Sequence, residues 1–272
     1  MTAKKKRIAL KAVFGLLIVV LGFALIGLQY WRSPKQLRLA VLRGNLLAVQ
    51  RAIWLGADVN HQIDPNRGFV GLSGEIAILW ERGYPALPAF GGITPLMYAA
   101  MGTDTEIAET LIEAGADLDL VNFDGWTALI IAVMMSDASM VDFLVDAGAD
   151  PDLTAAANGE TALSAAIRSE AGRLEKVKSL IAAGADLTAQ NVAGMTPLIW
   201  TSVMGAPEIV QALLEAGADL YAVDNEDHDA LHWADRLLHD DPSNAARLQV
   251  VELLTEAMTR ETEAGSPLQP DN

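Results

Sequence analysis

The sequence predicts an all-α repeat fold, because two short signals recur along most of the chain. The first is the tripeptide Gly-Ala-Asp, which begins at positions 56, 115, 148, 184 and 217. The second is a helix-start signal that follows most of these tripeptides by ten or eleven residues. Successive tripeptides are 59, 33, 36 and 33 residues apart, and a period near 33 is typical of stacked helical repeats. A third observation, an apolar stretch near the N-terminus, predicts one transmembrane helix before the repeats.

The N-terminal residues combine a basic cluster with this apolar stretch. Residues 1–11 contain four lysines and one arginine without an acid, which favours a cytoplasmic N-terminus. Residues 12–28 carry no charge and would span roughly 26 Å as a helix. We therefore expect a transmembrane signal anchor over residues 12–32, with the repeats outside the cytoplasm (in the periplasm, if the host is a Gram-negative bacterium). A cleaved signal peptide and a buried helix are the alternatives, and basic residues after the stretch weaken the orientation signal.

The first repeat, residues 33–60, ends in Gly-Ala-Asp but lacks the helix-start signal, so we interpret it as an N-terminal cap. An insertion over residues 61–91 accounts for the long first spacing. Glycine and proline at both of its ends predict a loop, and its apolar and aromatic residues include Trp80. This loop either covers apolar surface on the stack or contacts a partner.

Residues 92–257 carry the regular repeats. Thr94, Thr127, Thr161, Thr196 and Asp229 are expected to cap first helices by accepting a hydrogen bond from a backbone amide. The glycine of each tripeptide stands where the second helix must end, because glycine tolerates the left-handed conformation there. The sixth unit lacks Gly-Ala-Asp and is interpreted as a C-terminal cap, followed by a disordered tail over residues 258–272.

These motifs resemble the ankyrin pattern, in which Gly-x-Thr-Pro-Leu-His-x-Ala precedes a second helix and Leu-Leu-x-x-Gly-Ala-Asp. The pattern is carried here by residues 93–96, 126–129, 160–163 and 195–198. The resemblance covers roughly residues 36–255 and implies an ankyrin solenoid of about six helix-turn-helix units with short β-hairpin turns. It also implies that turn tips and first helices line a concave face that binds partners.

Candidate protein-binding residues follow from this resemblance. They occupy turn tips and first helices, with one tryptophan added from the insertion: Met101, Phe123, Trp126, Met134, Met135, Met195, Val203, Met204 and Trp80. Exposed methionine adapts to varied apolar partners, although filling the core between helices is its commoner use. The aspartates of the tripeptide come once per repeat, so we expect them to form hydrogen bonds within their turns.

Composition and motifs argue against other classes of function. The net charge is −16, and residues 12–272 hold 14 basic against 35 acidic residues, which disfavours nucleic-acid binding. The chain has no cysteine, no phosphate-binding loop and no nucleophile elbow. His228 and His232 have the i, i+4 spacing of a metal pair, but His228 lies before the helix cap. We therefore predict no enzyme, no metal, no cofactor and no small-molecule substrate.

The sequence thus predicts a membrane-tethered ankyrin-repeat module that mediates protein–protein interaction outside the cytoplasm, with another protein as its partner. One alternative is a stabilising or immunity-like accessory subunit of a specific partner enzyme. Another is an ankyrin scaffold that faces the cytoplasm.

Overall fold

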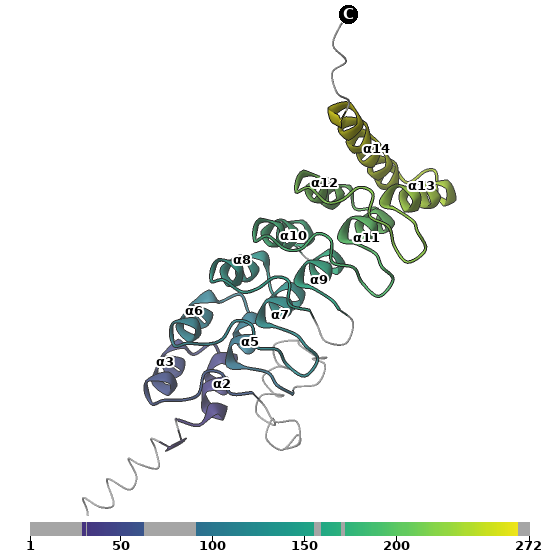
Figure 1. Cartoon of the computed structure of the whole chain (residues 1–272). Coiled ribbons are helices and arrows are strands. Elements are labelled where there is room, and N and C mark those ends of the chain that lie inside the picture. Colours follow the sequence, from purple (N-terminus) through teal and green to yellow (C-terminus); the bar gives the residue numbers. More distant parts are fainter. Residues whose placement is uncertain (1–28, 31, 63–90, 155–158, 170–171, 266–272) are drawn as a thin grey trace, which may run out of the picture. The chain divides into compact units, whose positions relative to one another are not determined.

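The computed structural model describes residues 29–30, 32–62, 91–154, 159–169 and 172–265. Within these ranges the chain forms six helix pairs and no strand (Figure 1). It divides into two compact units, which are considered separately below. Unit 1 comprises residues 1–99 and 104–117, and unit 2 comprises residues 100–103 and 118–272.

Unit 1 contains the first two helix pairs. The helices are α2 (Pro34–Leu42), α3 (Leu46–Trp54), α5 (Pro95–Ala100, the last residue of which belongs to unit 2) and α6 (Thr105–Glu113). Helix α2 packs on α3, and α3 also packs on α6. Leu37, Val49 and Leu111 are fully buried.

Unit 2 contains four helix pairs in two rows (Figure 1). The first helices contact one another in chain order: α7 (Ala128–Met135), α9 (Ala162–Arg168), α11 (Pro197–Met204) and α13 (Ala230–Asp240). The second helices form the other row: α8 (Ala138–Asp146), α10 (Arg173–Ala182), α12 (Pro207–Glu215) and α14 (Ala245–Gly265). Because each helix buries its apolar side against neighbouring repeats, stability comes from stacking rather than from any one repeat.

The predicted helix starts are confirmed. In unit 2 the side chains of Thr127, Thr161, Thr196 and Asp229 accept hydrogen bonds from the amides three residues onward, at 3.2, 3.2, 3.4 and 2.7 Å. In unit 1 Thr94 caps α5 in the same way, at 3.2 Å. Each such cap contributes about 1 kcal/mol.

The predicted helix ends are confirmed as well. The glycines that follow the second helices adopt positive φ angles, from +84° at Gly184 to +96° at Gly148. A residue with a side chain is strained in this region, so glycine ends these helices with little backbone cost.

The prediction of short β-hairpin turns is wrong for the part of the chain that the structure describes. We call the residues between the Gly-Ala-Asp tripeptide and the residue that caps the next first helix a finger. Fingers 118–126, 187–195 and 220–228 each contain two backbone hydrogen bonds, both at the residue that begins the turn. Its amide donates to the carbonyl four residues onward, from residue 122 to 126 (3.0 Å), 191 to 195 (3.1 Å) and 224 to 228 (3.0 Å), and its carbonyl accepts from the amide three residues onward, at 3.0, 2.8 and 3.1 Å. These bonds close a turn, whereas a strand pair requires a ladder of bonds that continues beyond it.

The predicted tail, residues 258–272, begins too early. Helix α14 continues through residues 258–265, and residues 266–272 lie outside the described part of the chain. The extension is supported by Thr259, whose hydroxyl donates to the Thr255 carbonyl at 2.8 Å, and by an i, i+4 ion pair between Arg260 and Glu256 at 3.1 Å.

Two further predictions concern residues that are not described. The expected anchor over residues 12–32 falls there except for residues 29, 30 and 32, and so does the insertion except for residues 61, 62 and 91. Among the helices that the structure does describe, none has the length and apolar character needed to cross a membrane.

Candidate functional site: the fingers and first helices of unit 2

One side chain organises each of the three fingers 118–126, 187–195 and 220–228. It lies five residues after the aspartate of the tripeptide and is Asn122, Asn191 or Asp224. The Asn122 Oδ1 accepts hydrogen bonds from the amides of residues 124 and 126, at 3.0 and 2.8 Å. The Asn191 Oδ1 accepts from residues 193 and 195, at 2.9 and 3.1 Å. This local bonding gives asparagine and aspartate their preference for turns, and here it holds the finger in place of a strand ladder.

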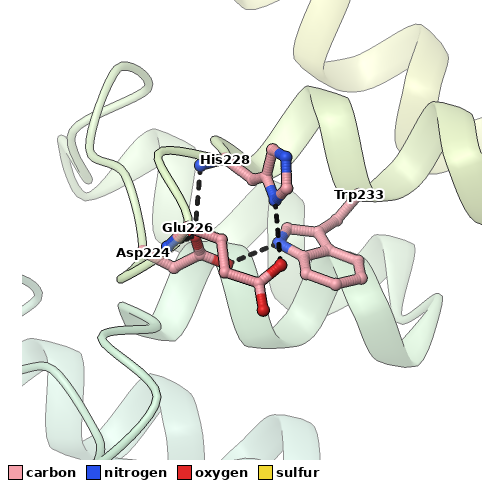
Figure 2. Close-up of polar contacts among 4 residues, drawn as sticks. All are labelled: Asp224, Glu226, His228 and Trp233. Atoms are coloured by element: carbon pink, nitrogen blue, oxygen red, sulfur yellow. Dashed lines mark hydrogen bonds and ion pairs between the residues drawn. The ribbon is translucent and has the colours of Figure 1, made fainter.

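The last finger adds a link to its own first helix (Figure 2). The Asp224 carboxylate accepts from the amides of Glu226 (2.8 Å) and His228 (3.1 Å), and from Trp233 Nε1 (2.7 Å). Burial raises the pKa of Asp224, but the hydrogen bonds from His228, Trp233 and Glu226 outweigh it and lower that pKa below its ordinary value. The carboxylate therefore remains charged while it joins finger 220–228 to α13.

The aspartates of the tripeptide form hydrogen bonds within their turns, as predicted. In unit 2, Asp150, Asp186 and Asp219 each accept from the amide two residues onward, at 2.9, 2.8 and 2.9 Å. A second set of bonds joins successive repeats: Asp119 accepts from the Asp150 amide at 3.0 Å, and Asp152 from the Asp186 amide at 2.7 Å. These two bonds hold the turns at Asp119, Asp150 and Asp186 in register with one another.

The last two described fingers also touch directly. The backbone N–H of Asn225 donates to the Ala193 carbonyl, and its side-chain Nδ2 donates to the Val192 carbonyl, both at 3.2 Å. Gly194 permits this approach. A Cβ at Gly194 would lie 2.5 Å from Asn225 Oδ1 and 2.6 Å from the Asn225 backbone nitrogen. The two fingers therefore form one surface of fixed geometry.

Most of the predicted binding residues in unit 2 reach the surface. Phe123, Met134 and Met204 are 57%, 39% and 37% exposed. Four others are half-buried: Trp126, Met135, Met195 and Val203. They come from finger 118–126 with α7 and from finger 187–195 with α11, so the repeat stacking brings them to equivalent places on their repeats.

Of the two remaining predicted residues, one is buried and the other is not described by the structure. Met101 is only 2% exposed, because its side chain lies in the core next to the C-terminal end of α5, so its assignment as a binding residue is corrected. Trp80 lies outside the described residues.

An ion pair stands between the two apolar repeats. Glu160 occupies the repeat position of Trp126 and Met195, and Arg168 occupies that of Met134 and Val203. The Arg168 Nη2 lies 2.7 Å from the Glu160 Oε1, with Glu160 buried and Arg168 about half exposed. Because Glu160 binds the Arg168 guanidinium, Arg168 presents a charged group in a fixed position between two apolar patches.

Sequence reasoning missed several exposed apolar side chains on the finger tips. Val192 is 82% exposed and Tyr221 is 55% exposed, and Val121 and Val223 are also exposed. An alignment of the finger sequences could have predicted these apolar positions. Val192 occupies the repeat position of Phe123, and Val223 occupies that of Val121. A row of such tips, one set per repeat, suits contact with a protein surface.

The two histidines of the last finger do not form a metal pair. The rings of His228 and His232 stack with centroids 3.9 Å apart and planes 5° apart. Parallel rings direct their nitrogen lone pairs along parallel planes, so these lone pairs do not converge on one ion. No group of three or more metal-binding side chains is found in the described ranges.

Comparisons with known proteins agree with this architecture. The chain matches the family of ankyrin repeats in three overlapping copies, at residues 37–155, 96–191 and 163–259. Nothing among curated protein sequences matches it. Among solved structures, it is similar to a chain of the complex between the predatory endopeptidase Bd0816 from Bdellovibrio bacteriovorus and the immunity protein Bd3460. The identity is 24%, the TM-score is 0.57, and the alignment covers 82% of this chain and 98% of that one.

That structural likeness shows a shared fold. The family matches extend over residues 37–259, nearly the whole range of the six helix pairs. Repeats of this kind indicate an interaction with another protein. The chain is therefore a member of the ankyrin-repeat family.

Proposed function

We propose that this chain is a membrane-tethered ankyrin module that binds another protein through the fingers and first helices of unit 2. One observation carries the binding surface: the finger tips expose large apolar side chains, among them Phe123, Val192 and Tyr221, at no benefit to the core. The hydrogen bonds within and between fingers hold the backbone that carries these side chains, so little backbone conformational entropy is lost when a partner binds.

Photocrosslinking in the native host tests this surface. A benzophenone amino acid placed at Phe123 or Val192 should crosslink to one defined protein. Gln211, exposed on the second helix α12, is the matched control position and should not. Equal crosslinking at all three positions, or none at either finger, would contradict the proposal.

The tether and its orientation are part of the same proposal. They are supported by the uncharged stretch over residues 12–28 and the basic residues before it. A reporter that is active only outside the cytoplasm, fused after residue 272, should be active, and the protein should keep its full-length mass. An inactive reporter favours the cytoplasm-facing scaffold instead.

A second candidate function is an immunity-like accessory subunit that binds a specific enzyme. The similarity to a chain of the endopeptidase–immunity protein complex favours it. Once the crosslinked partner is identified, its activity should be measured with and without this chain. Inhibition that Phe123→Ser and Val192→Ser relieve would support this candidate, whereas unchanged activity would leave simple binding.

A further inference from the structure

Helix α3 of unit 1 exposes two large apolar side chains that its own repeat does not use. Trp54 is 84% exposed and Leu47 is 78% exposed, while Val49 and Ala52 are the residues that α3 buries. Leu47 and Trp54 are seven residues apart, close to two helical turns, so both lie on the same side of α3. A tryptophan and a leucine exposed on the same side of one helix are typical of a surface that another phase or molecule covers.

The segment that contains α3 is basic, whereas α6, which packs on α3, carries the exposed acids Glu106, Glu109 and Glu113, and unit 2 is strongly acidic. Residues 29–62 contain five basic residues and one acidic residue. Residues 118–265 contain seven basic residues and 25 acidic residues. Arg43, at the C-terminal cap of α2, and Arg51, one turn after Leu47, are both exposed. Basic residues beside apolar ones favour an anionic lipid surface, while the acidic unit 2 disfavours such a surface.

The structure also places α3 near the end of the predicted anchor. Arg32, the last residue of that segment, donates from Nε to the Gly56 carbonyl at 3.3 Å. Gly56 follows Trp54 by two residues, so the C-terminal end of α3 and the start of the described chain lie together. A segment that leaves a bilayer near residue 30 therefore brings Trp54 to the depth of the lipid headgroups, where tryptophan is enriched.

We infer that α3 docks on the membrane surface, with Leu47 and Trp54 inserted among the lipids and Arg43 and Arg51 next to anionic headgroups. The inference rests on the proposed tether and adds a second contact, which fixes the orientation of unit 1 on the bilayer. Such a helix lies in the interface with its apolar side about 5–10 Å into the boundary between headgroups and acyl chains.

Lipid-dependent quenching of a single fluorescent label tests this docking. The chain has no cysteine, so Gln50→Cys on α3 gives one site for an environment-sensitive dye and leaves Leu47 and Trp54 intact. Gln211→Cys on α12 is the matched control, also an exposed glutamine on a second helix. The full chain is reconstituted into vesicles of phosphatidylcholine and phosphatidylglycerol that contain a lipid with a nitroxide quencher near the headgroup.

Docking predicts that the dye at residue 50 is quenched and the dye at residue 211 is not. The quenching should be lost in Leu47→Ser/Trp54→Ser. Arg43→Gln and Arg51→Gln should each shift the ratio of docked to undocked protein by roughly fivefold in anionic vesicles. They should leave it unchanged in vesicles of phosphatidylcholine alone.

Three outcomes would overturn the inference, and flotation of the vesicles separates the first two, in which the tether holds, from the third, in which it fails. Protein that floats with equal quenching at both sites has an anchor but no docked helix. A blue-shifted dye at residue 50 without lipid quenching indicates that a protein, such as a second copy of this chain, covers α3. Protein that does not float removes the tether and the docking together.

Discussion

Substitution of Gly194 by alanine tests how the fingers of unit 2 are held together. Gly194 has φ +75°, and an added Cβ would lie 2.6 Å from the backbone nitrogen of Asn225. Real Cβ atoms do not approach a backbone atom this closely, so finger 220–228 must move. The movement would break the two hydrogen bonds by which Asn225 reaches the preceding finger.

The expected loss of stability is the sum of two effects. The left-handed backbone costs alanine about 1–2 kcal/mol relative to glycine, and two lost hydrogen bonds cost about 1 kcal/mol each. The total is about 3–4 kcal/mol. Gly184 is the matched control, because it has φ +84° with nothing within 4 Å of the added Cβ. Gly184→Ala should therefore lose only the backbone part, about 1–2 kcal/mol.

Urea unfolding followed by circular dichroism measures both variants against the parent protein. The difference between the two alanine variants isolates the contact with Asn225. If Gly194→Ala loses no more stability than Gly184→Ala, the close packing of the two fingers is not a feature of the protein in solution. The structural reasoning behind the finger surface would then be refuted.

Three further substitutions in unit 2 have defined outcomes. Asp227, the only residue other than glycine with positive φ (61°) in the described part of the chain, should gain about 1 kcal/mol as Asp227→Gly, measured by the urea midpoint. Asp152→Ala should lose about 1–2 kcal/mol in the same assay, because its carboxylate accepts from the Asp186 amide; an unchanged midpoint would remove the register bond. Burial lowers the pKa of Lys176, more than Asp137 raises it, and its ammonium donates to the Val133 carbonyl at 2.7 Å. Since the folded state then binds the proton less well than the unfolded state, stability should rise with pH from the lowered pKa up to its ordinary value of 10.5. Lys176→Met should remove this rise, measured as unfolding free energy at several pH values below 10.5.

The sequence alone predicted the parts of the fold that depend on local chemistry. A threonine or an aspartate at a helix start has few other ways to satisfy an orphan amide, and glycine after a helix has few competitors for positive φ. These positions recur near every 33 residues, so the assignment of a helix start or end in one repeat is supported by the same assignment in the others. The six helix pairs and the roles of the tripeptide aspartates followed from this.

Other features depend on what surrounds a residue, which a local pattern does not contain. Met101 falls on the same repeat position as the exposed Met134, yet it is buried. Leu47 and Trp54 read as ordinary helix residues, and only the packing of α3 shows them facing outward. The fingers carry the motif of a hairpin, but their backbone hydrogen bonds close only the turn and do not continue into a pair of strands.

The way each finger closes has a consequence for how such a protein can change its specificity. The turn is held by one asparagine or aspartate side chain bonded to the backbone, so the tip side chains at positions 123 and 192 take no part in holding it. Substitutions at these tips can therefore accumulate under selection for a new partner without a penalty to folding. The positions proposed for recognition and the positions that hold the turn are therefore separate within the same short segment, and each set can evolve, or be engineered, independently of the other.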